Sequence, residues 1–195
     1  MLSEPVPTRR RFTAEEVLRM VEAGILREDE PCELIDGELF TMSPQGPVHR
    51  SRAVKLHIAL ERAFGAGYHV QDHSPIAAGP DSLPEPDVAV VRGEVDDFLD
   101  RHPSGPDVVL VVEVSVTSHA IDRAKAGVYA RAGVREFWHL DVPGRRLTVR
   151  TEPRPALGEY AAERHLHDGD AAVANGARIE VSAMLPPPPT RAGGS

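Results

Sequence analysis

Hydrophobic and polar positions in the first quarter of the chain predict one helix and one β-hairpin. Residues 13–24 have apolar positions at helical spacing, and Thr13 followed three residues later by Glu16 is a capping-box pattern. Residues 32–42 contain two apolar runs separated by an Asp-Gly pair at Asp36. This pair is the strongest short signal for a two-residue hairpin turn.

The rest of the chain alternates between helix and strand patterns. Apolar residues fall on one helix face over 48–64, and a second helix pattern covers 118–132, with Gly133 as a plausible C-cap. Residues 108–114 are an almost unbroken Val/Leu run, which predicts a central strand buried on both faces. Further strand patterns lie at 68–76, 87–91, 136–141, 147–149, 158–162 and 178–181, with an acidic loop or helical turn at 94–102 and a polar turn at 168–170.

This order of elements predicts a mixed β-sheet flanked by helices, in an α/β or α+β domain. We expect a flexible N-terminal arm at 1–11, a single domain at 12–185, and a disordered Pro/Gly-rich tail at 186–195. At 195 residues the chain has about the length of one domain.

Composition narrows the class of protein. The single cysteine, Cys32, excludes a disulfide scaffold and a Cys-rich zinc module, and it favours a reducing, cytoplasmic location. We find no secretory signal and no apolar stretch long enough for a membrane helix, so no membrane partner is expected. A net charge of −8 argues against a protein that coats nucleic acid, but it is compatible with an acidic site that recruits cations.

Two acids occupy strand positions that normally exclude them. Glu113 directly follows five Val and Leu residues, and a carboxylate buried there must be paired, protonated or bound to a metal. Asp87 begins the preceding short strand. If these strands are neighbours with the acids near corresponding ends, both carboxylates reach one cation, for which oxygen ligands favour Mg²⁺ or Mn²⁺.

A lysine follows on the next helix. Lys125 comes twelve residues after Glu113, and its ammonium could reach back over the strand end to stabilise charge on a phosphoryl group or to orient water. Tyr129 lies one helical turn beyond Lys125 on the same face, where a core position is the simpler interpretation.

Further motifs accompany these residues in a consistent order from about residue 13 to 141. They are Glu33-Leu34-Ile35-Asp36-Gly37-Glu38, Met42-Ser43-Pro44 followed by His49, Pro86-Asp87, Val112-Glu113-Val114, Asp122-Arg123-Ala124-Lys125 leading to Tyr129, Ala132-Gly133-Val134, and Glu136-Phe137-Trp138. Taken together, they resemble the Uma2 family (DUF820), one of the PD-(D/E)XK nucleases in the restriction-endonuclease-like superfamily.

The resemblance implies a restriction-endonuclease-like core with a metal-dependent phosphodiesterase site. It implies that Asp87 and Glu113 are metal ligands, with the backbone carbonyl of Val114 as a third. It also implies that Glu33 is an additional acid facing the site. Lys125, on the helix, would take the place of the lysine that the superfamily usually has on the strand.

The chain departs from the superfamily pattern at Ser115, which stands two residues after the acid where lysine is usual. The role of Lys125 therefore depends on where the folded chain places its ammonium, and it does not follow from a match to the superfamily motif. His49 either forms a hydrogen bond within the site or caps the second helix, and we count it with Ser115 and Tyr129 as supporting residues.

Simpler interpretations stay open for several residues. Pro-Asp at Asp87 is a common turn pair, Glu33 can form an ion pair within the hairpin, and Lys125 can be a solvated helix lysine. The histidine pairs lack a clear third ligand at zinc spacing. These pairs are His69 with His73, and His165 with His167.

Two functions follow from these observations. The first is a metal-dependent endonuclease that hydrolyses phosphodiester bonds of nucleic acid, most simply DNA, with Mg²⁺ or Mn²⁺ at Asp87 and Glu113. The second is a non-catalytic module that binds nucleic acid or protein and retains the nuclease fold, which the acidic charge and Ser115 favour. A homodimer is a further expectation, because exposed sheet edges favour pairing.

Overall fold

Helices and strands alternate along the chain largely as the hydrophobic pattern predicts. The computed structural model describes residues 8–117 and 120–188. Its elements are α1 (Ala14–Glu22), β1 (Cys32–Ile35), β2 (Glu38–Thr41), α2 (Pro47–Phe64), β3 (Tyr68–Gln71), β4 (Val88–Arg92), the 3₁₀ helix η1 (Val95–Phe98), β5 (Val108–Ser115), α3 (Ala120–Ala132), β6 (Glu136–Asp141), β7 (Arg146–Arg154), β8 (Glu159–His167), β9 (Ala171–Ala174), β10 (Ala177–Glu180) and α4 (Val181–Met184).

Six strands form a central mixed sheet in the order β3-β4-β5-β6-β7-β8. Neighbouring strands are antiparallel except β5 and β6, which are parallel and connected by α3. All eight residues of β5 are buried, which confirms the prediction that its Val/Leu run forms a central strand. The predicted class, a mixed sheet flanked by helices, is confirmed.

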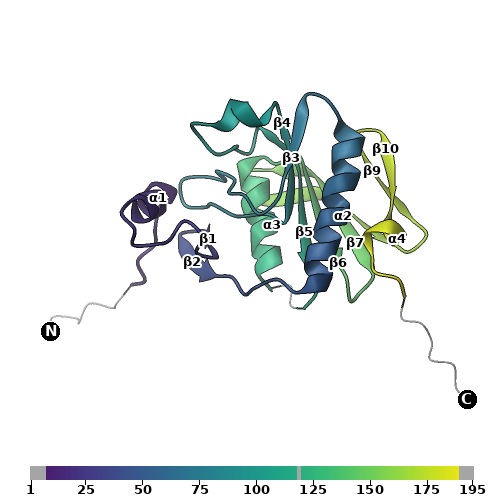
Figure 1. Cartoon of the computed structure of the whole chain (residues 1–195), viewed down its shortest axis with the longest axis horizontal. Coiled ribbons are helices and arrows are strands. Elements are labelled where there is room, and N and C mark those ends of the chain that lie inside the picture. Colours follow the sequence, from purple (N-terminus) through teal and green to yellow (C-terminus); the bar gives the residue numbers. More distant parts are fainter. Residues whose placement is uncertain (1–7, 118–119, 189–195) are drawn as a thin grey trace, which may run out of the picture.

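Helices cover both faces of this sheet, and Figure 1 shows α2 and α3 on opposite sides of it. Side chains of a strand alternate between faces, so β5 supplies residues to two separate cores. On one side, Leu56 of α2 packs in a cluster with Val112, to which β9, β10 and α4 also contribute. On the other side, Tyr129 of α3 packs with Val111 and Phe137.

A small N-terminal unit of α1 and the β1–β2 hairpin lies on the α3 side of the molecule (Figure 1). The predicted capping box at the start of α1 is present, and the hairpin turns at Asp36 and Gly37, both with positive φ. Ile35 packs against Val128 of α3, and Asp36 forms an ion pair with Arg131 near the end of that helix. The hairpin is therefore fastened to α3.

Several boundaries differ from the sequence pattern. β3 ends at Gln71 rather than at residue 76, and His73 just beyond it has a positive φ of 43°. Strands β7 and β8 are longer than 147–149 and 158–162, because these outer strands carry charged and half-exposed residues that a hydrophobic pattern does not reveal. β10 ends at Glu180, since Val181 begins α4.

The expected ends of the chain lie mostly outside the described residues, as do residues 118–119 of the predicted helix. Between residues 8 and 188, excluding 118–119, the helices are all too short or too polar to cross a membrane.

Candidate active site

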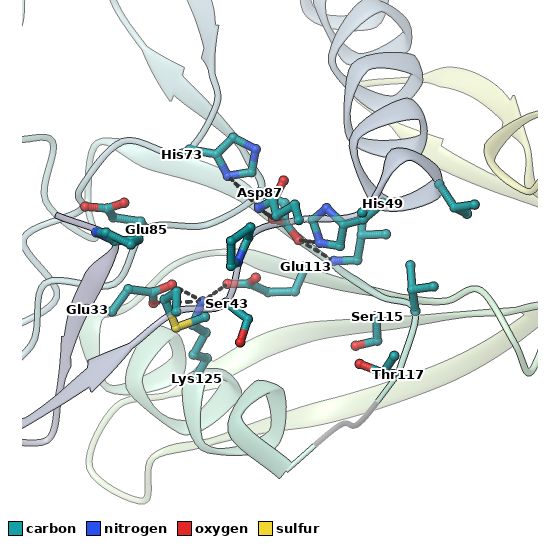
Figure 2. A pocket seen from close by; sticks show the side chains of 18 of the residues that line it. Glu33, Ser43, His49, His73, Glu85, Asp87, Glu113, Ser115, Thr117 and Lys125 are labelled. Atoms are coloured by element: carbon teal, nitrogen blue, oxygen red, sulfur yellow. Dashed lines mark hydrogen bonds and ion pairs between the residues drawn. The ribbon is translucent and has the colours of Figure 1, made fainter. Parts of the chain in front are cut away.

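A pocket of about 900 Å³ opens where β5 ends and β4 begins (Figure 2). Because β4 and β5 are antiparallel with Val88 opposite Val112, Asp87 comes opposite Glu113. Strand alternation places both acids on the α3 side of the sheet. The backbone N–H of Val114 donates to Asp87 Oδ2 at 2.7 Å, which fixes the aspartate to the end of β5.

Glu113 is 3% exposed and receives two hydrogen-bonding groups from α3. The hydroxyl of Tyr129 donates to Glu113 Oε1 at 2.8 Å, and Lys125 Nζ lies 3.2 Å from the same oxygen. Tyr129 is fully buried against Phe137, so it is a core residue whose polar end reaches the site.

Lys125 lies between two glutamates (Figure 2). Its Nζ donates to Glu33 Oε1 at 2.9 Å and lies 2.8 Å from Glu33 Oε2. The lysine is 2% exposed and Glu33 is 4% exposed, so neither the solvated lysine nor an ion pair confined to the hairpin is correct. The spacing of one helical turn between Lys125 and Tyr129 brings both to Glu113.

Burial and mutual repulsion determine the charge states of these groups. Burial raises the pKa of Glu113 well above its ordinary value; Lys125 opposes this rise, and Asp87 and Glu33 add to it. Burial also raises the pKa of Glu33, against the effect of Lys125. For Lys125, burial lowers the pKa, but the attraction of Glu113 and Glu33 outweighs burial and raises it. The lysine therefore stays protonated at neutral pH.

Asp87 is surrounded by polar side chains from two loops and from the first turn of α2. His49 Nε2 lies 3.1 Å from Asp87 Oδ2, and Gln45 Nε2 donates to Oδ1 at 3.2 Å. His73 Nδ1 lies 3.6 Å from Oδ1 and 3.2 Å from Gln45. His49 thus forms an interaction inside the pocket, as one of its two sequence-based interpretations requires.

Ser115 lines the same pocket at the position where the superfamily pattern has lysine. Its hydroxyl is buried and lies 2.7 Å from His139 Nε2 on β6. The structure therefore places every residue predicted to be catalytic, metal-binding or supporting at or beside one pocket: Glu33, His49, Asp87, Glu113, Val114, Ser115, Lys125 and Tyr129.

Three polar pocket residues were not among the site candidates from the sequence, where His73 was considered only in a zinc pair with His69. Gln45 and His73 reach Asp87 from loops, and Glu85 lies in the pocket wall two residues before Asp87. Burial, with repulsion from Glu33, raises the pKa of Glu85 to about 7. The only sequence signal for Glu85 is its nearness to Asp87, since its loop has no periodic pattern.

The donor set fits a hard divalent cation held by few protein ligands. Within residues 8–117 and 120–188, no group of three or more His, Cys, Asp or Glu side chains could hold a metal ion. Mg²⁺ is usually bound by one or two carboxylates together with water and substrate oxygens, so an acid pair suffices. The pocket lining has four carboxylates against one lysine, which leaves negative charge for a cation to neutralise.

Comparisons with known proteins identify the family of the chain and agree with its fold. The family model of Uma2, described as "putative restriction endonuclease", matches residues 14–184. A crystal structure from Anabaena variabilis, described as a "putative nuclease belonging to DUF820", has a similar fold, with a TM-score of 0.70 at 16% identity over 89% of this chain and 97% of that one. A search of curated proteins finds no significant match. The chain, matched over most of its length, belongs to the Uma2 family.

Proposed function

We propose that this protein is a metal-dependent endonuclease that hydrolyses phosphodiester bonds of DNA. The observation that carries the proposal is the buried pair Asp87 and Glu113 on neighbouring strands, with the ammonium of Lys125 beside Glu113 in one pocket. The family description and the name of the similar structure support the same class of reaction.

Asp87 and Glu113 are the residues that would hold Mg²⁺ or Mn²⁺. The N–H of Val114 points to Asp87, and in a strand the N–H and C=O of one residue point to the same side. The carbonyl of Val114 is therefore directed toward the acid pair and is the third candidate ligand. A bound cation supplies polarisation of the phosphate and a lowered pKa for bound water.

The residues of the chain supply positive charge and orientation. Lys125 remains protonated, so it stabilises negative charge on the phosphoryl group and does not accept a proton from water. Glu33 holds the ammonium in place from the hairpin side, and the hydroxyl of Tyr129 fixes the carboxylate of Glu113. On the other side of the site, His49 and Gln45 restrict the orientation of Asp87.

Cleavage of defined DNA tests this proposal. Single- and double-stranded substrates are incubated with Mg²⁺, Mn²⁺ or a chelator, using the wild type and Glu113→Gln. We expect cleavage that needs the metal and falls on the order of a hundredfold or more in the variant, because a ligand is lost while the volume is kept. The matched control is Glu163→Gln, which removes the charge of an exposed glutamate on β8 that is paired with Arg150 on β7.

Two results would reject the proposal. One is a folded wild type that cleaves neither substrate with either metal, and the other is full activity in Glu113→Gln. DNA binding without cleavage would instead support the non-catalytic module, the alternative suggested by Ser115 at the lysine position.

A further inference from the structure

The outer face of helix α2 carries positive charge that no ion pair with the described part of the chain neutralises. The helix contains four Arg and Lys residues and one acid, Glu61, although the whole chain has a net charge of −8. Three of these cations are exposed: Arg50, Lys55 and Arg62. The fourth, Arg52, is buried and donates to the carbonyl of Leu185, so its role is structural.

The three exposed cations make no ion pair or side-chain hydrogen bond with any residue in the described part of the chain. Exposed arginines elsewhere are commonly paired, as Arg101 is with Asp107 and Arg178 is with Glu180. A cation that has no internal partner keeps its full capacity to bind an external anion. On α2, all three exposed cations are available in this way.

The placement of these cations relates them to the pocket. Residues of the first turn of α2, Val48 and His49 among them, line the pocket, and Arg50 follows directly. Lys55 and Arg62 are seven residues apart, so they lie on the same side of the helix about 10 Å apart along its axis. From Arg50 to Arg62 the axial distance is about 18 Å.

The face between the cations is partly apolar and accessible. Val54 is 44% exposed and Ile58 is 41% exposed. Figure 1 shows α2 across the front of the sheet, with the β9–β10 hairpin and α4 beside it. A small anion in the pocket would not reach cations spread over this length, whereas a polymer with regularly spaced phosphates would.

We propose that the outer face of α2, comprising Arg50, Val54, Lys55, Ile58 and Arg62, binds the phosphate backbone of the DNA strand that leads into the pocket. The choice of DNA as the polyanion rests on the proposed function. Phosphate contacts of this kind position the polymer without reading its sequence. The net charge of −8 disfavours binding of a polyanion over the protein as a whole, so binding is expected to be local.

A triple variant tests the surface without touching the site. Arg50→Gln, Lys55→Gln and Arg62→Gln are combined in the full chain, and binding to fluorescein-labelled DNA is followed by anisotropy over a range of salt concentrations. We expect about tenfold or greater weakening at low salt, and a salt slope that is smaller by roughly two to three units for duplex DNA. For cleavage, KM rises while kcat stays near the wild-type value, since none of the three side chains contacts the acid pair.

The matched control removes the same charge elsewhere. Arg92, Arg135 and Arg164 are exposed, have no ion pair with a described residue, and lie away from the pocket, so their combined change to Gln should leave DNA binding unchanged. Equal weakening in this control would overturn the inference, because total charge would then explain the effect.

The outcomes separate the inference from the proposed function. A wild type that cleaves DNA, with unchanged binding in the α2 variant, overturns the inference and leaves the nuclease intact. DNA binding that depends on α2, in a protein that never cleaves, supports the inference and rejects the nuclease. A wild type that binds no DNA overturns the inference.

Discussion

Lys125 is the residue on which the charge balance of the site depends. Its ammonium contacts Glu33 and Glu113, and all three side chains are almost completely buried. A buried ion pair adds little stability compared with apolar residues, but removal of one partner leaves a buried charge without compensation. Removal of the lysine should therefore lower the stability of the fold, in addition to removing its proposed interaction with phosphate.

Replacement of Lys125 by Met should destabilise the fold by about 3–5 kcal/mol at neutral pH. The loss should shrink in acid, because the glutamates then become protonated and neutral. Urea unfolding at pH 7.5 and pH 5 measures both effects. The chain's other lysine, exposed Lys55, provides the control, and Lys55→Met should change stability by less than about 0.5 kcal/mol. An equal, small effect of both substitutions would show that Lys125 is not the counter-ion.

Glu85 should make stability fall with rising pH. Its pKa is about 7 in the folded protein against an ordinary value of 4.5, so the folded state binds more protons between these values. Stability from this group is present below about pH 4.5 and is lost as pH rises to about 7. In Glu85→Gln this loss is absent, so the unfolding free energy of the variant should rise relative to wild type over that window. Urea unfolding of both proteins from pH 4.5 to 8 measures this difference. A constant difference in unfolding free energy over that range would contradict the raised pKa of Glu85.

Among single residues, the sequence indicated as candidates those whose type conflicts with the apolar strand around them. Glu113 after a run of valines and Asp87 on the adjacent strand were recognisable for that reason. Gln45, His73 and Glu85 were not, because they lie in irregular loops whose paths depend on tertiary packing. The contact between Lys125 and Glu33, 92 residues apart in the chain, needed the docking of the hairpin on α3.

The crossover from β5 through α3 to β6 positions most of the site. β5 presents Glu113, while α3 presents Lys125 and Tyr129 to it one turn apart. The return of α3 to the sheet brings its last residues against the loop before β5, where a Cβ on Gly105 would meet the carbonyl oxygen of Ala132 at 1.7 Å. This close approach of two backbones leaves no room for a side chain at Gly105.

Gly105→Ala should therefore be strongly destabilising, by several kcal/mol, because neither backbone can move aside as a flexible side chain would. A matched substitution within α3 should have the opposite sign. At Gly127 an added Cβ would make only contacts of 3.4 Å, and Gly→Ala inside a helix stabilises by roughly 0.5–1 kcal/mol. Thermal unfolding of the two variants checks the pair. Similar melting temperatures would disprove the close contact.

Elements with strong periodicity were predictable, and those at the sheet periphery were less so. The buried run of β5, the amphipathic α1 with its capping box and the Asp-Gly hairpin follow from local sequence. The full lengths of β7 and β8 do not, since charged residues and Pro153 interrupt their apolar pattern. The short β9, formed by Ala and Val residues, has no distinctive signal.

For the proposed binding of nucleic acid, the distribution of charge over the whole molecule is more important than the net charge. Acids gather in the pocket, while α2 beside it carries three exposed cations, Arg50, Lys55 and Arg62, that form no ion pair with a described residue. The net charge of −8 argues against nucleic-acid binding through bulk charge, and the proposed α2 surface is compatible with that value because it is local. Strand order and the opposition of Asp87 to Glu113 arise only from the assembled sheet, which explains why the sequence indicated candidate residues that line one pocket better than the contacts among them.

The central claim is that Asp87 and Glu113 together hold one catalytic cation. Calorimetric titration of the folded, metal-free protein with Mn²⁺ tests it most directly, with wild type, Asp87→Asn and Glu113→Gln compared under one buffer condition. We predict one Mn²⁺ per chain in the wild type, and binding weakened at least about tenfold in each variant. An absence of Mn²⁺ binding to the wild type, or equal affinity in all three proteins, would contradict the account.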